Sequence, residues 1–509
     1  MPQGLSFDEL QVVSDLHLGG VTGFQMFDAA TELAWLADQV ALSPASGLAA
    51  LVVNGDFIDF LAEAPALAFD PQGAIIKLDR VMDDPAFSPV FDAFRRLLAC
   101  PRRLLVVNLG NHDLELALPW VRRHFANRLA PDDAARARLL MVTDGTGFAC
   151  QVGPTQVLCL HGNEVDSWNV TDFERLRRIG RDLQSGQPAA PWTPNAGSQL
   201  VVEVMNQVKA RYPFVDLLKP ETEAVVPILA ALNPQLLGRL QELTGIARRK
   251  AVDAVRMQAG FLDADAPARA RTDRAPPGDP WAQPPPGAEA AHTAATADLL
   301  ARADLAWQQG IDPMSLLRGS PGEQLGVWGA TWDWLTGKPR HEVLREALEF
   351  IDKDQSFDPG APDATFKAFD SLVAPEVDWV ITGHTHLERS LRRQRGSGHY
   401  FNSGTWATLM QITPAVRQDP ARFARLFALL DGGTVPALRQ AEPGLVLARR
   451  TVVSIYRDAP DRSRAELRHV LTQAGVTRAD SVAGTARVIG PSFSPNLGPT
   501  VSPTPAAKA

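Results

Sequence analysis

The sequence is poor in cysteine, with three in 509 residues. Cys100, Cys150 and Cys159 are odd in number, lie among apolar residues and are not spaced as metal ligands are. This pattern argues against a disulfide framework and against a thiolate metal site. We expect free thiols in a reducing compartment.

Long apolar runs, a secretory signal and an excess of positive charge are also missing. No stretch approaches the ~18 apolar residues that cross a bilayer, and the first residues lack a basic stretch followed by an apolar one. We therefore expect a cytoplasmic protein without a transmembrane segment, with peripheral membrane contact left open. The net charge of -8 makes nucleic acid an unfavourable main partner, although a local basic groove is compatible with it.

The chain is too long for one average domain, which predicts one large core with an elaboration. Short apolar runs between helix-like stretches predict buried strands. The expected strands are Leu10–Ser14, Leu51–Asn54, Leu104–Leu109, Leu139–Val142, Phe148–Val152, Val157–Leu160, Val377–Thr382, Arg389–Arg393, His399–Asn402 and Thr451–Tyr456. Helices are expected at Asp28–Leu42 and Ser88–Cys100.

The strand pattern stops between residues 163 and 374, where we predict a helical insertion. Its helix-like segments are Thr171–Leu183, Gln199–Leu218, Glu221–Leu232, Leu236–Gln258, Ala297–Gln309 and Glu342–Asp352. Residues 264–296 are rich in Pro and Ala, which predicts a flexible loop within the insertion. Residues 458–489 form a C-terminal extension, and the Pro- and Ser-rich residues 490–509 are predicted to be a disordered tail.

Five short polar motifs follow predicted strands, where open α/β sheets place their ligand-binding groups. In chain order they are Asp15-Leu16-His17, Gly55-Asp56-Phe57-Ile58-Asp59, Gly110-Asn111-His112-Asp113, His161-Gly162 and Gly383-His384-Thr385-His386. Five of the ten histidines lie in these motifs. One such motif alone is common by chance, but the concentration of all five predicts a shared site.

The motifs supply carboxylate, imidazole and amide groups, which are ligands of divalent transition metals. Two metals about 3.5–4 Å apart can hold a phosphoryl group and lower the pKa of a bridging water. Such a site needs one shared ligand, and Asp56 is the candidate because a carboxylate has two oxygens and Gly55 gives the backbone room. Without a thiol, the ligand set suits Mn, Fe or Zn, of which we expect Mn.

In content and order the five motifs resemble those of the calcineurin-like metallophosphoesterase superfamily. The resemblance covers residues 8–162 and 375–457, and it implies a four-layer αββα fold, in which two mixed sheets pack face to face and are flanked by helices. Residues 1–162 and 375–457 would form this α/β core. The large helical insertion, residues 163–374, would be placed within it.

The resemblance also implies a role for each motif. The first metal would be held by Asp15, His17 and His386, the second by Asn111, His161 and His384, with Asp56 bridging the two. His112 would be the general acid while a metal-bridging hydroxide attacks phosphorus in line. Asp59 would orient His112, and Asp113 would steady the loop. The implied activity is hydrolysis of a phosphate ester or anhydride in a phosphorylated small-molecule or lipid-linked substrate.

A narrower likeness connects the chain with hydrolases of UDP-2,3-diacylglucosamine. It rests on residues 14–18, on His161-Gly162-Asn163 and on the turn Tyr400–Trp406. Those hydrolases usually carry Arg where this chain has His112, carry Asp where it has Asn163, and lack an insertion of this size. The superfamily is therefore predicted, and that particular substrate is not.

Three alternatives stay open from the sequence. The insertion is predicted to be a cap over the site, because its ends join strands that lead to ligands, and an interface for another protein or subunit is the alternative. The enzyme could be a nuclease, or the chain a non-catalytic scaffold that binds partner proteins. An arginine cluster at residues 175–181 could recognise phosphate or form a solvated helix face. The oligomeric state is not predicted.

Overall fold

The computed structural model describes residues 4–22, 25–166, 168–209, 211–219, 228, 339–348, 356–431, 434–442 and 444–490. Two compact units contain them: residues 1–202, 355–408 and 448–509 form unit 1, and residues 203–354 and 409–447 form unit 2. Apart from residues 228 and 490, the helices predicted at Glu221–Leu232, Leu236–Gln258 and Ala297–Gln309, the loop 264–296 and the tail 490–509 lie outside the described residues. The predicted domain limits stay predictions.

Unit 1 is built on strands that meet at β1 (Ser6–Val13). β1 pairs in parallel with β2 along one edge and antiparallel with β12 along the other. The strands of this first sheet are, in order, β14 (Val476–Ser481), β13 (Arg462–Gln473), β12 (Thr451–Ala459), β1, β2 (Leu48–Asn54), β3 (Arg103–Asn108) and β4 (Leu139–Val142), with β15 (Arg487–Ile489) also on β13.

Ser6 and Phe7 of β1 also pair with β5, so all these strands belong to one continuous 13-stranded sheet. We call its part from β5 onward the second sheet. Its strands are, in order, β5 (Phe148–Val152), β6 (Thr155–Cys159), β7 (Trp379–Thr382), β9 (His399–Asn402) and β8 (Arg389–Arg392). β6, β7 and β9 run in parallel, so their carboxyl ends share one edge. β1, β2 and β3 share an edge in the same way.

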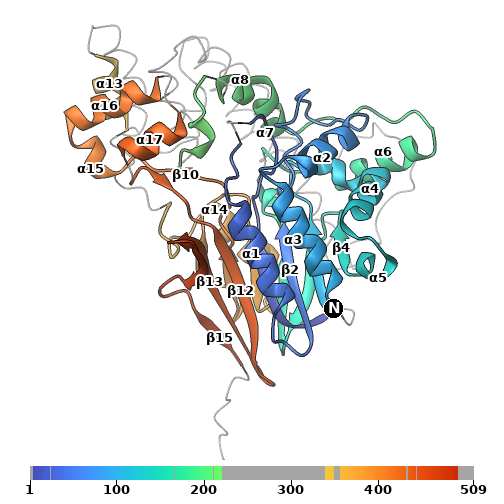
Figure 1. Ribbon diagram of the computed structural model, residues 1–509. Coiled ribbons are helices and arrows are strands. Elements are labelled where there is room, and N and C mark those ends of the chain that lie inside the picture. Colours follow the sequence, from blue (N-terminus) through green and yellow to red (C-terminus); the bar gives the residue numbers. More distant parts are fainter. Residues whose placement is uncertain are drawn as a thin grey trace, which may run out of the picture. The chain divides into compact units, whose positions relative to one another are not determined.

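Alternate side chains of the first sheet enter two different cores, as the two-residue period of a strand requires. Val13, Leu51 and Val107 pack against helices, whereas Val12 and Val52 pack against the second sheet. The covering helices are α1 (Ala30–Ala41), α2 (Ala74–Asp83), α3 (Ser88–Ala99) and α4 (Pro119–Leu129). α1 and α3 lie side by side over this sheet (Figure 1).

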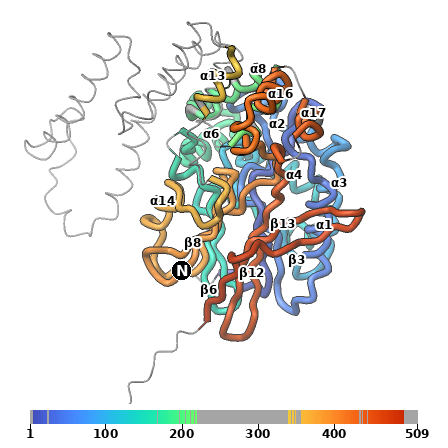
Figure 2. The backbone as a smooth tube through the Cα atoms, turned by 90° about the vertical axis from the view of Figure 1, so that its left-hand side faces the viewer, coloured from blue at the N-terminus to red at the C-terminus, as the bar shows by residue number. Residues whose placement is uncertain are grey.

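The second sheet is covered on its other face by α14 (Ala364–Leu372). Phe366 and Phe369 of this helix pack against Val380, Leu391 and Tyr400 of the sheet. Figure 2 shows α14 and β8 on one side of unit 1 and α1 and α3 on the other, with strands between them. The predicted four-layer αββα class is confirmed.

All ten predicted strands are present, with ends shifted by a few residues. The helix predicted at Gln199–Leu218 is wrong as one element. It is divided into α7 (Ala196–Leu200), a π-helical turn (Val201–Met205) and α8 (Asn206–Lys209), followed by a 3-10 turn, η4 (Val215–Leu217). Pro213 lacks an N–H and disfavours helical backbone at the preceding residue, so the helix stops before it.

Unit 1 has four further helices or helical turns in its described part. They are η1 (Leu114–Ala117), α5 (Asp133–Arg136), η2 (Asn163–Val165) and α6 (Phe173–Gln184). α6 confirms the helix predicted at Thr171–Leu183. β13 to β15 were not predicted as strands, because the charged residues on their exposed faces interrupt the apolar pattern.

Unit 2 is mostly helical in its described part. Its elements are α8, η4, α13 (Arg340–Ala347), β10 (Leu409–Met410), α15 (Pro414–Arg417), α16 (Pro420–Leu430), α17 (Val435–Ala441) and β11 (Val446–Leu447). β10 pairs with β11, and Leu218 forms a β-bridge with Met410. α13 covers the first part of the helix predicted at Glu342–Asp352. No helix in the described part of the chain has the length and apolar character of a membrane span.

The buried carboxyl group of Glu115 makes the free energy of unfolding depend on pH. Glu115 is 1% exposed and accepts a hydrogen bond from the backbone N–H of Asp70 at 2.8 Å. Burial raises the pKa of Glu115 from 4.5 to about 7, and it outweighs the backbone hydrogen bonds to the carboxylate and the charge of Lys77, which lower the pKa. The Glu115 carboxyl group therefore binds its proton more tightly in the folded state than in the unfolded state.

We predict that Glu115→Gln flattens the pH dependence of unfolding. The contribution of Glu115 is fully present below pH 4.5 and is lost as the pH rises to about 7. Chemical denaturation should therefore show the variant more stable than the parent at pH 8, by up to about 3 kcal/mol, and little different at pH 4.5. Glu376→Gln, at an exposed position, should keep the parental profile, and identical profiles for all three proteins would refute the assignment.

Candidate metal centre

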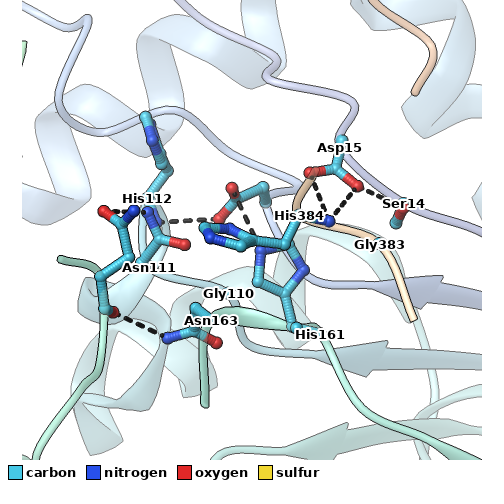
Figure 3. A network of polar contacts seen from close by, with 12 residues as sticks. Ser14, Asp15, Gly110, Asn111, His112, His161, Asn163, Gly383 and His384 are labelled. Carbon is cyan, nitrogen blue, oxygen red and sulfur yellow. Dashed lines mark hydrogen bonds and ion pairs between the residues drawn. The ribbon is translucent and has the colours of Figure 1, made fainter. Parts of the chain in front are cut away.

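The five motifs meet at the carboxyl ends of parallel strands. Asp15 follows β1, Asp56 follows β2, and Asn111 follows β3, while His161 and His384 follow β6 and β7 of the other sheet. Figure 3 shows Asp15, Asn111, His161 and His384 drawn together from these different segments. The two sheets therefore contribute ligand-type side chains to one place.

Five residues of the motifs have left-handed backbone conformations. Their φ values are 53° at Asp15, 49° at His17, 51° at Asp56, 68° at His384 and 62° at His386. Such values are uncommon for residues with a Cβ and persist where surrounding contacts enforce them, most often at functional sites. Here the enforcing contacts include Asp15 N–H to the Gly55 carbonyl at 3.1 Å and His17 N–H to the Asp56 carbonyl at 2.9 Å.

A first group of potential ligands consists of Asp15, His17 and His386, whose ligand atoms lie within 4.8 Å of one another. Nε2 of His386 is 3.3 Å from Oδ1 of Asp15 and 3.0 Å from Nε2 of His17. Asp15 is fully buried, and its carboxylate also accepts the backbone N–H of His384 at 2.9 Å. The arrangement places one carboxylate and two imidazoles around a common point.

A second group consists of Asp56, His161 and His384, whose ligand atoms also lie within 4.8 Å of one another. Oδ2 of Asp56 is 3.2 Å from Nε2 of His161 and 3.8 Å from Nε2 of His17. Asp56 therefore lies between the two groups, where a shared ligand is needed. The buried Oδ1 of Asn111 accepts no hydrogen bond from any described residue, which is the state expected of an amide oxygen that serves as a ligand.

The orientation of His161 fits a cation as its partner. Nδ1 of its ring lies 2.9 Å from the carbonyl oxygen of Asn54. A carbonyl only accepts, so Nδ1 carries the proton, and a neutral ring turns the lone pair of Nε2 toward the Asp56 carboxylate. Two acceptors face each other at that point, and they require either a proton or a metal ion between them.

The electrostatics of the site agree with this requirement. Burial lowers the pKa of His161, but the negative charge of Asp56 close to its ring outweighs burial and raises the pKa to about 10. Burial raises the pKa of Asp15, but His386 and His161 outweigh it and hold the pKa at about 2. The buried carboxylates thus favour positive charge beside them, and divalent cations would supply it.

His112 and Asp59 form a separate pair at the edge of these groups. Nδ1 of His112 is 3.0 Å from Oδ1 of Asp59, while Oδ2 of Asp59 is 3.4 Å from Nδ1 of His17. The His112 side chain is 16% exposed and that of Asp59 is 4% exposed. His112 therefore presents its ring toward solvent while a buried carboxylate holds its other side.

Other residues hold the motif loops in place. The carboxylate of Asp113 accepts the N–H groups of Phe57 at 2.8 Å and Gly110 at 2.7 Å, which agrees with its expected role in the loop. The side chain of Asn402 donates to the Gly383 carbonyl at 2.7 Å, and the Thr405 hydroxyl donates to the Asp15 carbonyl at 2.8 Å. The Tyr400–Trp406 turn thus connects the first and fifth motifs.

Gly110 allows the third motif to pass close to the second. A Cβ atom at this position would lie 2.1 Å from Oδ1 of Asp56 and 2.5 Å from its backbone nitrogen. Since real Cβ atoms do not approach so closely, any side chain at position 110 would displace Asp56. The glycine of the Gly-Asn-His-Asp motif is therefore required by packing around the Asp56 carboxylate.

Some residues at the site were not found from the sequence. Asp166 lies 2.8 Å from Nε2 of His384, and Asn169 lies 3.5 Å from Nδ2 of Asn111. Their only signal in the sequence is their position a few residues after His161. The arginines of α6 make contacts elsewhere. Arg177 pairs with Glu174 and Arg181 with Asp182, while Arg175 donates to the Pro191 carbonyl and Arg178 to the Glu174 carbonyl.

Residues 11–212 match the model of the family described as calcineurin-like phosphoesterase. The predicted resemblance is confirmed, and it supports the broad class of metal-dependent phosphoester hydrolases. The fifth motif lies outside the matched residues and reaches the site through β7. Comparisons with curated proteins and with solved structures gave no match.

We predict that Gly110→Ala weakens metal binding at least about tenfold, because the added methyl group displaces the Asp56 carboxylate. Gly444→Ala is the matched control, since a Cβ there meets no atom within 4 Å. Mn²⁺ binding by equilibrium dialysis measures the difference. Parental affinity in the Gly110→Ala protein would contradict the close packing described for this loop.

Proposed function

We propose that this chain, a calcineurin-like phosphoesterase over residues 11–212, hydrolyses phosphate esters or anhydrides at a binuclear metal site. The observation that carries the proposal is the position of Asp56. Its Oδ2 lies between His17 of one ligand group and His161 of the other. A carboxylate in that position has the geometry of a bridging ligand.

The proposed ligand sets follow from the two groups. Asp15, His17, His386 and Asp56 hold the first metal, and Asn111, His161, His384 and Asp56 hold the second. When bound, the two metals would offset the charge of a phosphate and lower the pKa of a water between them. Because every proposed ligand atom is a nitrogen or an oxygen, the set supports Mn, Fe or Zn, and we propose Mn.

In this proposal His112 protonates the leaving oxygen. Its side chain is more exposed than that of Asp59, so a substrate can reach the ring. The Asp59 carboxylate holds Nδ1 of the ring. With the Nδ1 proton engaged by a carboxylate, a protonated His112 directs its Nε2–H outward as a general acid. Asp59 acts through His112 and is a positioning residue.

The bond cleaved would be a phosphate ester or a phosphate anhydride. A phosphorylated small molecule or lipid-linked substrate stays the expected class. The role of residues 163–374 as a cap that selects this substrate also stays a prediction. A panel of mono-, di- and pyrophosphate substrates on Mn-loaded protein would separate the bond types, and inhibition by single-stranded DNA that salt relieves would support the nuclease alternative instead.

We predict that His112→Ala reduces turnover by about 10²–10⁴-fold for a phosphoester with an alkyl leaving group. The loss should be much smaller for a p-nitrophenyl ester, because p-nitrophenolate leaves without being protonated. Steady-state kinetics on both substrates, with metal content measured in parallel, tests this prediction.

His124→Ala is the control for the general-acid assignment. His124 also pairs with a carboxylate, Asp79 at 2.7 Å, but is not among the residues grouped around the metal centre. It should keep parental turnover of both esters. Equal losses for the two leaving groups in His112→Ala would remove His112 from the role of acid.

We predict that chelation abolishes turnover and that Mn²⁺ restores it in the parent chain. Asp56→Asn should regain no more than a small fraction of parental activity on the same Mn²⁺ addition, because a neutral amide bridges two cations poorly. Metal analysis and activity are measured on the same samples. Fewer than one bound metal per parental chain would favour the non-catalytic scaffold, and full activity in Asp56→Asn would defeat the bridging role.

A further inference from the structure

We propose that Asp166 and Asn169, in the loop after His161, position two of the ligands of the second metal. The inference rests on the proposed function and extends it beyond the five motifs. Asp166 supports His384 and Asn169 supports Asn111, so this one loop orients ligands that come from β7 and β3. Both residues act through a ligand and neither is assigned a direct contact with the metal.

The contact between Asp166 and His384 determines which imidazole nitrogen is available. Oδ2 of Asp166 lies 2.8 Å from Nε2 of His384. An ionised carboxylate only accepts hydrogen bonds, so Nε2 carries the proton and the lone pair is on Nδ1. A carboxylate on the far nitrogen of a ligating histidine fixes its tautomer and ring orientation and increases its basicity.

Asp166 is itself held in place by its own loop. Its Oδ1 accepts the backbone N–H of Trp168 at 2.9 Å, and its Oδ2 accepts the side-chain amide of Asn169 at 2.7 Å. These bonds fix the carboxylate while it faces His384. The ligand groups around Asp56, His161 and His384 do not include Asp166, which agrees with a supporting position outside them.

Asn169 acts on the amide of Asn111 in an equivalent way. Its Oδ1 lies 3.5 Å from Nδ2 of Asn111. With the Asn111 amino group directed to Asn169, the buried Oδ1 of Asn111 is left for the metal. The backbone carbonyl of Asn169 accepts the side-chain amides of Asn163 at 3.1 Å and Asn195 at 3.2 Å, and Figure 3 shows Asn163 beside this network.

Titration of metal-free protein with Mn²⁺ tests the inference without reference to turnover. In Asp166→Asn the amide can still accept the Trp168 N–H, but the negative charge behind His384 is removed. We expect the dissociation constant of the second Mn²⁺ to rise about 10–100-fold while that of the first stays unchanged. The thermal unfolding of the metal-free protein should be unaffected, which a merely structural role would not allow.

Two further variants complete the test. Asp79→Asn removes a similarly exposed carboxylate that pairs with a histidine away from the proposed ligands, and it should bind both metals as the parent does. Asn169→Ala should weaken the second site selectively, and it carries the test if Asp166→Asn does not fold.

The possible results are distinguishable. Parental affinity at both sites in Asp166→Asn and Asn169→Ala would overturn the inference, as would equal weakening of both sites with a lower unfolding temperature. A parental chain that binds no metal would instead overturn the proposed function, and one that binds a single metal would overturn the second site that this inference requires.

Discussion

Burial of two carboxylates, those of Asp15 and Asp56, is the constraint on which the rest of this structure depends. Both are at most 2% exposed, and a buried ionised carboxylate is strongly unfavourable unless positive charge or hydrogen bonds compensate it. Histidines from two sheets surround them, and the N–H groups of His112 and His384 donate to them. The site is therefore arranged to hold cations.

This constraint explains features that are unfavourable when considered alone. Left-handed backbone at Asp15, His17, Asp56, His384 and His386 costs conformational energy, and it persists because strand ends, turns and side-chain hydrogen bonds hold each loop. The same requirement explains why a glycine precedes Asn111 and why Asp113 binds two backbone N–H groups. The fold thus orients each of the proposed ligands.

The sequence was sufficient for the core strands and for the list of candidate ligands, because buried strands and strand-end motifs are local patterns. The layer arrangement came from the resemblance of these motifs to a known superfamily. The sequence was insufficient where tertiary contacts override local patterns. The exposed faces of β13 to β15 conceal strands in charged sequence, and Pro213 ends a stretch whose apolar spacing favoured a longer helix. Asp166 and Asn169 gave no signal beyond their position a few residues after His161, because their proposed role consists of contacts with residues distant in the chain.

What the sequence by itself determined is the kind and order of the chemical groups: five motifs, nitrogen and oxygen ligands, and an acid beside them. Only the tertiary structure decided how these groups meet. Parallel pairing in two sheets brings the carboxyl ends of β1, β2 and β3 together with those of β6 and β7, and this places Asp56 between two histidine groups. The spacing of residues along the chain does not give the distances between these groups, because the distances arise from the packing of one sheet on the other.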